Sequence, residues 1–158
     1  MIEIERKFTL KNTNFLLSAI RVFKITQGYL NSHPDRTVRV RTKGDKGYLT
    51  IKGRSSQDGL MRMEWEKEIP LAEALQLLEL CEDFIIEKTR HEVIYAGNTF
   101  EIDVFEGKNQ GLILAEVELN QENQQIELPE WIDREVTGDS RYYNSYLSNN
   151  PYSLWTNG

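Results

Sequence analysis

The sequence predicts a β-rich α+β fold, with about seven or eight antiparallel strands and two to four helices. Three observations lead to this prediction: apolar and charged residues alternate in segment after segment, turn-forming residues separate these segments, and helix signals are few. Each such strand has one apolar and one charged face, so the sheet is either a barrel or a sandwich with one solvated face. We expect a single domain over residues 1–158.

The first strand is predicted in the stretch EIERK, residues 3–7. Its Glu3, Glu5 and Lys7 occupy every second position, so in a strand they lie on one face. The same alternation recurs in RTVRVRT (36–42), YLTIKG (48–53), LMRMEWEKEI (60–69), IIEKTRHEVI (85–94), TFEIDVF (99–105) and LILAEVELN (112–120). Hairpin loops are predicted at 42–47 and 95–99, and longer connections at 54–59 and 106–111.

Capping residues and apolar stripes predict three helices, over residues 13–22, 71–80 and 141–147. Pro70 would open the second helix, because proline is favoured at a helix start. Asp139 or Ser140 would cap the third helix, and Pro151 would stop it.

The composition limits the setting and the partners. No apolar run approaches the roughly 20 residues that cross a bilayer, so we expect no membrane span. The single cysteine, Cys81, has no partner for an intramolecular disulfide, which favours a reducing, cytoplasmic location. The net charge of −6 argues against non-specific binding of nucleic acid, while the 19 Lys and Arg residues leave room for a polyanionic ligand.

The charges are sorted by sign within strands. Glu3 and Glu5 are neighbours on one face, and so are Glu116 and Glu118, while Arg39 and Arg41 form a basic pair. A solvated face with cross-strand ion pairs is the simpler interpretation, but it gives no reason to place like charges side by side. Acid pairs become favourable around a divalent cation and basic pairs around an anion, which indicates a site shared by metal and phosphate.

At this point the sequence resembles a known family. EIERK matches the E-x-E-x-K motif of the CYTH superfamily, also called triphosphate tunnel metalloenzymes. Further segments resemble the family's other motifs in order: QGYL (27–30), RVR (39–41), TIK (50–52), RMEWE (62–66), EKTR (87–90), EID (101–103), LAEVEL (114–119) and VTGDSRYYN (136–144). The resemblance implies a closed eight-stranded antiparallel β-barrel, or tunnel, with a polar interior and a few helices packed outside.

The resemblance also implies roles for the charged residues. The acids would bind Mg²⁺ or Mn²⁺, with Glu3, Glu5, Glu116 and Glu118 as ligands, and Glu101 and Asp103 assisting directly or through water. The phosphate-binding residues would be Lys7, Arg39, Arg41, Lys52, Arg62, Lys88 and Arg90.

The implied reaction is hydrolysis of a terminal phosphoanhydride of a small-molecule triphosphate, most simply inorganic tripolyphosphate. Glu5 or Glu118 could accept a proton, and Lys88 or Lys7 could stabilise charge on the transferred group. Tyr29 is a candidate for acid–base work, with a packed aromatic side chain as the alternative.

Other activities remain open at this stage. A class IV adenylate cyclase would need an adenine pocket, and a thiamine or nucleoside triphosphatase would need a clamp for the organic group. A non-catalytic module that binds polyphosphate or nucleotides is a different class, but such a module would gain nothing from so many inward carboxylates without metal. The sequence leaves open whether the protein is a monomer or a homodimer, and whether residues 148–158 close one mouth of the tunnel.

Overall fold

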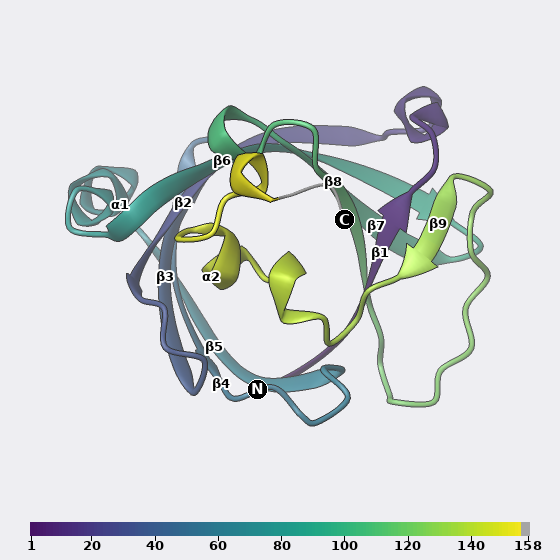
Figure 1. The fold of residues 1–158 in the computed structure, drawn as a ribbon, viewed down its shortest axis with the longest axis horizontal. Helices are drawn as coiled ribbons and strands as arrows, with labels where there is room; N and C mark the ends of the chain where they lie inside the picture. The colour runs from purple at the N-terminus through teal and green to yellow at the C-terminus, as the bar shows by residue number, and fades with distance from the viewer. Residues whose placement is uncertain (156–158) are drawn as a thin grey trace.

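The computed structural model describes residues 1–155, except the side chain of Asp83. Over these residues the strands form one antiparallel sheet in the order β5-β4-β3-β2-β6-β7-β8-β1-β9, and β1 also pairs with β5. This last pairing closes β1 to β8 into a ring, which Figure 1 shows from one end. The closed eight-stranded barrel implied by the resemblance is therefore confirmed, with β9 as one additional strand beside β1.

The predicted alternation identifies all of the described strands except β2 and β9. The strands are β1 (Ile2–Leu10), β2 (Arg21–Asn31), β3 (Arg36–Lys43), β4 (Lys46–Gly53), β5 (Met61–Ile69), β6 (Glu82–Tyr95), β7 (Asn98–Phe105), β8 (Ile113–Glu118) and β9 (Ile132–Glu135). The two short predicted hairpins are confirmed, since Lys43 pairs with Lys46 and Tyr95 with Asn98. The closing seam between β1 and β5 is short: Ile2, Glu3 and Ile4 pair with Met63, Arg62 and Met61.

The helices are shorter than the sequence predicts. They are the α-helices α1 (Leu71–Leu78) and α2 (Asn144–Leu147) and the 3-10 turns η1 (Asn14–Leu17), η2 (Gly107–Asn109), η3 (Ser140–Tyr142) and η4 (Tyr152–Leu154). In the part of the chain that the structure describes, no helix has the length and apolar character that a membrane span requires.

The helix α1 confirms the prediction for residues 71–80 and lies outside the barrel against β3 and β4 (Figure 1). Pro70 stands directly before it, as predicted. The close approach depends on Gly47, because a Cβ there would lie 2.6 Å from Cβ of the fully buried Ala74.

The prediction of a helix over residues 13–22 is wrong. Only the turn η1 forms, and the chain becomes extended at Arg21, where β2 begins. The sequence from Val22 to Thr26 is rich in β-branched and aromatic residues, which favour strands. The backbone N–H of Ile20 already donates to Glu92 O, so pairing with β6 competes successfully with the helix.

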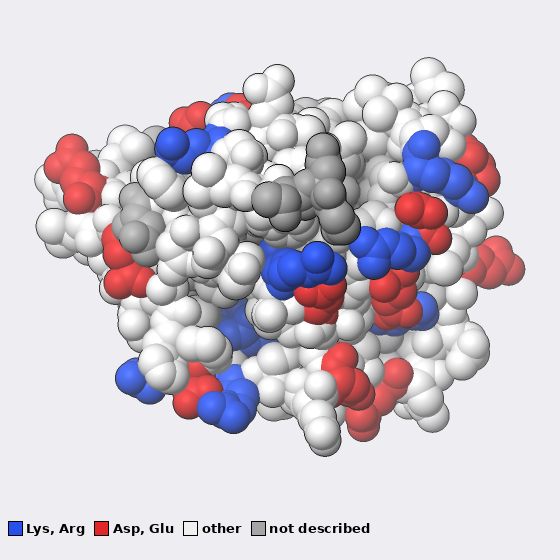
Figure 2. Space-filling model, in the orientation of Figure 1, with Lys and Arg blue, Asp and Glu red and all other residues white. Residues whose placement is uncertain are grey.

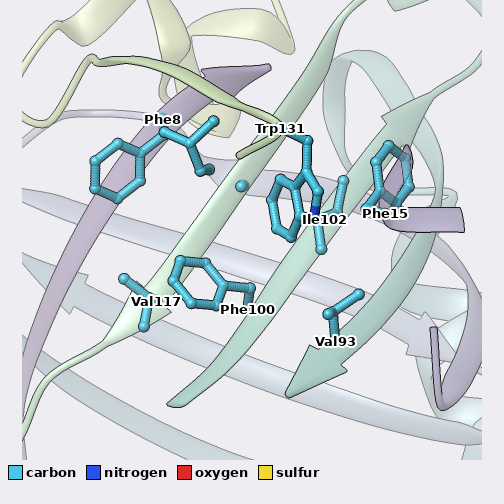
Figure 3. Close-up of a cluster of buried hydrophobic side chains, with 9 residues drawn as sticks. Phe8, Phe15, Val93, Phe100, Ile102, Val117 and Trp131 are labelled. Atoms are coloured by element: carbon cyan, nitrogen blue, oxygen red, sulfur yellow. The ribbon is translucent and has the colours of Figure 1, made fainter. Parts of the chain in front are cut away.

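An apolar core covers the outer face of β6, β7 and β8, as expected for a barrel whose charged faces point inward. Phe15 of η1 and Trp131, which precedes β9, stack edge to face with ring centroids 5.9 Å apart. Trp131 also packs on Phe100 of β7, and all three rings are buried (Figure 3). Residues 11–20 and 126–132 thus shield this side of the sheet.

One end of the barrel interior is apolar, which corrects the prediction of a polar interior throughout. Ile86 and Phe105 lie two residues from Lys88 and Asp103, so they occupy the same strand faces. They belong to a buried cluster that comprises Tyr29, Ile86, Phe105, Leu112, Leu114, Val136, Tyr142 and Leu147.

Residues 137–155, which we call the C-terminal segment, cross this end of the barrel (Figure 1). Tyr142 and Leu147 pack into the cluster, and Tyr152 and Trp155 pack against it. Unlike α1, η3 and α2 therefore lie at the end of the barrel rather than on its outer face. Asp139 does cap this region, since its carboxylate accepts a hydrogen bond from the N–H of Arg141, but the predicted helix divides into η3 and α2. Residues 156–158 lie outside the described residues.

The outer surface carries charges of both signs. In the face shown in Figure 2, Lys and Arg side chains lie beside Asp and Glu side chains rather than in a large patch of one sign. Pairs such as Arg6 with Glu135, 2.8 Å apart, and Arg141 with Asp139, 2.9 Å apart, account for part of this mixture.

Two glycines join the β4–β5 loop to the C-terminal segment, and replacing one of them is expected to destabilise the protein. Gly59 has φ +78°, and a Cβ there would overlap the backbone of Gly138. We expect Gly59→Ala to lower the free energy of unfolding by about 2 kcal/mol or more, through backbone strain and the displacement of Gly138. Denaturant unfolding measures this loss.

Gly97 provides the matched control for Gly59. It has nearly the same φ, +81°, but no atom of the described residues, apart from its two chain neighbours, lies within 4 Å of a Cβ placed there. Gly97→Ala therefore carries only the cost of the positive φ, about 1 kcal/mol. Equal losses in the two variants would show that the contact between Gly59 and Gly138 contributes nothing.

Candidate active site

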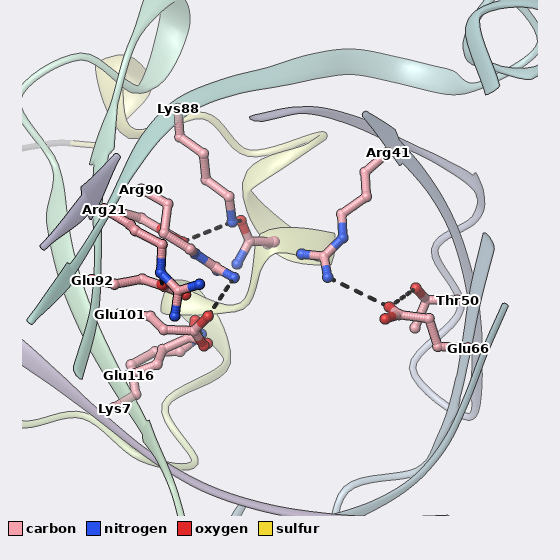
Figure 4. A network of polar contacts seen from close by, with 12 residues as sticks. Lys7, Arg21, Arg41, Thr50, Glu66, Lys88, Arg90, Glu92, Glu101 and Glu116 are labelled. Carbon is pink, nitrogen blue, oxygen red and sulfur yellow. Dashed lines mark hydrogen bonds and ion pairs between the residues drawn. The ribbon is translucent and has the colours of Figure 1, made fainter. Parts of the chain in front are cut away.

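The charged side chains predicted from the sequence converge inside the barrel. Figure 4 shows charged side chains pointing inward from different sides of the ring, with Arg90 and Glu116 on one side and Glu66 on the other. One cavity contains most of the predicted site residues: Glu3, Glu5, Lys7, Tyr29, Arg39, Lys52, Arg62, Lys88, Arg90 and Glu116. The predicted residues Arg41, Glu101, Asp103 and Glu118 do not line this cavity.

Three acidic residues form a group of convergent carboxylates. Glu3, Glu5 and Glu118 each offer an oxygen, and these oxygens lie within 4.8 Å of one another. The register of the barrel brings them together, because Glu5 of β1 stands opposite Glu118 of β8. Burial and the neighbouring charges of Glu116 and Glu3 raise the pKa of Glu5 well above its usual value.

This group fits a divalent metal ion. Three convergent carboxylate oxygens are the ligand type that Mg²⁺ and Mn²⁺ prefer, and a cation would remove the repulsion that raises the pKa of Glu5. Glu118 is the most exposed member, so the group is accessible from solvent. Glu116, the fourth predicted ligand, is not a member of this group, and Lys7 Nζ lies 3.5 Å from its carboxylate. Burial alone would raise the pKa of Glu116, but Lys7, Arg90 and Lys88 together lower it well below its usual value.

Arg39 and Arg41 of β3, together with Lys52 of β4, form what we call the basic wall, and both arginines make long ion pairs. Arg39 and Arg41 lie 3.4 and 3.5 Å from the carboxylate of Glu66. Burial and the charge of Arg39 lower the pKa of Arg41 to about 10. Among the described residues, the buried Nε atoms of both arginines have no hydrogen-bond partner. These guanidinium groups therefore have donors left for an anion.

Lys52 joins the acidic group to this basic wall. Its Nζ lies 2.9 Å from Glu3 and 3.4 Å from Glu64. Burial, a hydrogen bond with Glu3 and the charge of Glu3 raise the pKa of Glu64 to about 6. The acidic group and the basic residues are thus in direct contact.

Asp103 does not join the acidic group, which argues against its predicted role at the metal. Both of its oxygens accept hydrogen bonds from Arg90, at 2.8 and 2.9 Å, and Lys88 Nζ lies 2.9 Å from the second oxygen. Glu101 likewise accepts from Arg90 at 3.1 Å. Burial opposes ionisation of Asp103, but Arg90 and Lys88 lower its pKa below the usual value. Asp103 and Glu101 therefore hold the two cations in place.

Lys88 is the most buried of the predicted cations, at 1% exposure. Burial lowers its pKa to about 8, although Asp103 acts in the opposite direction. Tyr29, the predicted acid–base residue, lines the same cavity but is 5% exposed and packs in the apolar cluster at the barrel end. Both the catalytic and the packing interpretations of Tyr29 fit this position.

The sequence analysis did not identify several residues of this site. Thr50 Oγ1 donates to Glu66 at 2.6 Å and accepts from Arg39 at 3.2 Å, so it orients the acid between the arginines. Tyr143 and Asn144 line the cavity from the C-terminal segment. The motif VTGDSRYYN contains both of these residues, but nothing in its composition predicts that they reach the barrel interior.

A closed barrel with a carboxylate group and a basic wall in one cavity defines a class of proteins. The cavity can hold a divalent cation and a compact polyanion at the same time, whereas an open sheet would leave both groups solvated. The class is that of closed antiparallel barrels with a charged interior, and comparison with known proteins identifies the family.

The chain belongs to the CYTH family, because the model of the CYTH domain matches residues 1–145. It is 49% identical to an inorganic triphosphatase of Acetivibrio thermocellus over 151 residues, which cover 95% of each chain. It is 36% identical to an inorganic triphosphatase of Nitrosomonas europaea over 152 residues, which cover 94% of this chain and 97% of that one. The crystal structure of the inorganic triphosphatase NE1496 has a TM-score of 0.67 and 32% identity, covering 92% of this chain and 93% of that one.

Proposed function

We propose that this protein is a metal-dependent triphosphatase that hydrolyses the terminal phosphoanhydride of inorganic tripolyphosphate. The observation that supports this proposal most strongly is one cavity that is lined both by Glu3 and Glu5 of the acidic group and by basic residues such as Arg39 and Lys52. The names of the two curated relatives favour the inorganic substrate over a nucleotide. The predicted cytoplasmic location, the possible homodimer and the single domain over residues 1–158 stay predictions.

The phosphate chain would be held by the basic residues that line or face the cavity, namely Lys7, Arg39, Arg41, Lys52, Arg62, Lys88 and Arg90. Arginine forks bind phosphate oxygens through two parallel hydrogen bonds, and lysines act as point charges. Because these cations are already fixed by Glu66, Asp103 and Glu3, little reorganisation is needed when the substrate enters. Positioning and charge stabilisation are the main demands of phosphoryl transfer.

Glu3, Glu5 and Glu118 would hold Mg²⁺ or Mn²⁺. A bound divalent cation neutralises charge on phosphate oxygens and lowers the pKa of coordinated water. Glu5 or Glu118 is placed to accept a proton from the attacking water, while Lys88 stabilises negative charge on the transferred group. Tyr29, on the same cavity wall, is placed to donate or accept a proton.

The decisive test is product analysis. The purified protein is incubated with tripolyphosphate, ATP, GTP and thiamine triphosphate, each with Mg²⁺ or Mn²⁺. Orthophosphate and pyrophosphate from tripolyphosphate support the proposal. Cyclic AMP from ATP would support a class IV adenylate cyclase, and preferred turnover of an organic triphosphate would overturn the assignment of substrate. Binding without turnover of any compound would show a non-catalytic module.

Metal binding is expected to weaken as the pH falls. The raised pKa of Glu5 means that the metal-free site retains a proton at pH values where an ordinary glutamate has lost it. A cation binds the deprotonated form, so the dissociation constant for Mg²⁺ should decrease as the pH rises. Calorimetric titrations between pH 5.5 and pH 8 measure this dependence, in roughly half-unit steps. In Glu5→Gln the same titrations should show a weaker affinity that depends less on pH; an unchanged pH dependence would assign the proton to another group.

A further inference from the structure

The buried side chain of Lys88 has a partner that comes from the C-terminal segment. Its Nζ donates to Asn144 Oδ1 at 3.0 Å, and the same oxygen accepts from Gln27 Nε2 at 3.1 Å. Because both neighbours are donors, the orientation of the Asn144 amide is defined: its oxygen faces Lys88 and Gln27. Gln27 is fully buried, so this contact is shielded from water.

The hydrogen bond to Asn144, at 3.0 Å, directs one donor of the Lys88 ammonium group, and the carboxylate of Asp103 forms an ion pair with the same group at 2.9 Å. An ammonium group has three N–H donors arranged about the Cε–Nζ bond, so fixing one of them fixes the rotation about this bond and hence the directions of the others. Both Lys88 and Asn144 line the cavity, where a remaining donor can meet a phosphate oxygen.

The segment contacts a second predicted phosphate ligand in a similar way. Lys7 Nζ donates to the backbone oxygen of Tyr142 at 3.0 Å, and it lies 5.6 Å from the centre of the Tyr143 ring. Three successive residues, Tyr142 to Asn144, thus touch the cations that hold the substrate in the proposed reaction. Packing of the apolar end of the barrel alone does not require these contacts with Lys7 and Lys88.

We propose that Asn144 is a positioning residue that directs the Lys88 ammonium group toward the phosphate group being transferred. This inference rests on the proposed triphosphatase function. Asn144 acts through Lys88, so its contribution should be visible only while Lys88 is present.

The test compares Asn144→Leu with Asn144→Asp. Leucine has nearly the same size but no acceptor, so we expect kcat for tripolyphosphate to fall about 10- to 100-fold, the effect of one hydrogen bond to a charged group. Aspartate keeps an acceptor oxygen for Lys88, so kcat should recover to within about threefold of the original protein, while the added negative charge raises KM. Equal losses of kcat in both variants would overturn the proposal.

A double-mutant cycle with Lys88→Met separates positioning from a structural role. If Asn144 acts through Lys88, Asn144→Leu should cause no further loss of kcat in the Lys88→Met protein. Independent, multiplicative losses would overturn the proposal.

Ser148→Ala is the matched control, because Ser148 is buried in the same segment and its hydroxyl donates to Ser145 O, at 2.8 Å. It should leave kcat unchanged, whereas a loss equal to that of Asn144→Leu would assign the effect to loosening of the segment.

Binding measurements keep this inference distinct from the proposed function. Calorimetric titration with tripolyphosphate, without metal, reports on the interaction of Lys88 with the anion in the absence of turnover. If the original protein binds tripolyphosphate but does not hydrolyse it, the proposed function fails. The double-mutant cycle of Asn144→Leu and Lys88→Met is then measured with the dissociation constant for tripolyphosphate in place of kcat. Non-additive effects of the two substitutions there would support the pairing of Asn144 with Lys88, and additive effects would refute it.

Discussion

Glu5→Gln is expected to lower kcat/KM for tripolyphosphate more than about 100-fold, because even partners of metal ligands contribute 10- to 100-fold to affinity or activity. Glu5 is the member of the acidic group whose pKa is most strongly raised, by burial and by the charges of Glu116 and Glu3. Glutamine keeps the size of the side chain and removes this repulsion. The metal-free variant should therefore be at least as stable as the original protein, while its activity is lost.

Steady-state kinetics and thermal unfolding with and without Mg²⁺ together measure this effect. The original protein should gain thermal stability from Mg²⁺, since a ligand that binds only the folded state stabilises it, and Glu5→Gln should gain much less. Glu73→Gln, an exposed substitution in α1, is the control and should change neither quantity. Full activity of Glu5→Gln would remove Glu5 from the mechanism.

The largest loss of stability is expected from Asp103→Asn. Asp103 is 1% exposed and compensates the charges of both Arg90 and Lys88. Removing one partner of a buried ion pair costs about 3–5 kcal/mol, because the other charge remains buried without compensation. Lys88 can release its proton, since its pKa is already lowered to about 8, but Arg90 stays charged, and we therefore expect a loss of about this size.

Urea unfolding measures the loss in Asp103→Asn. Glu68→Gln is the matched control, because it removes a carboxylate from an exposed pair, 3.9 Å from Lys46, which should cost less than about 1 kcal/mol. The double variant Arg90→Met with Asp103→Leu should recover much of the stability, since apolar residues of similar size often replace a buried ion pair without loss. A small effect of Asp103→Asn alone would show that Arg90 is adequately compensated by Glu101.

The alternation of charged and apolar residues predicted which side chains share a strand face. It identified the pairs Glu3 with Glu5 and Arg39 with Arg41, which lie inside the barrel as expected. It could not predict that these faces point inward, because a strand in a sandwich has the same pattern. The inward direction follows from closure of the barrel, which depends on the pairing of β1 with β5 between residues about 60 positions apart. Only the resemblance to a family indicated this closure.

The sequence also could not predict which acids pair with buried cations. The resemblance implied that Glu101 and Asp103 assist the predicted metal ligands, directly or through water. In the barrel Asp103 stands opposite Arg90, and this cross-strand neighbour determines its role. A contact of this kind depends on the register between strands, which a single strand does not specify.

The apolar end of the barrel was missed for a related reason. Tyr142 and Leu147 were predicted within a helix, but their partners Ile86 and Phe105 belong to strands whose other inward residues are charged. Along each of these strands the inward-facing residues change from charged to apolar. An alternation with a period of two residues shows which residues share a face, but it does not show where along the face this change occurs.

The position of β1 in the ring has a consequence for how the chain folds. β1 is synthesised first, yet its neighbours β5, β8 and β9 all follow it by more than fifty residues. The hairpins from β2 to β5 and from β6 to β8 can form locally, whereas the N-terminal strand must wait until the ribosome has released most of the chain. Closing such long loops slows folding, so insertion of β1 is expected to be the slow, late step in refolding. During that interval the unpaired edges of β5 and β8 are exposed, and pairing between these edges of two chains is the characteristic route to aggregation.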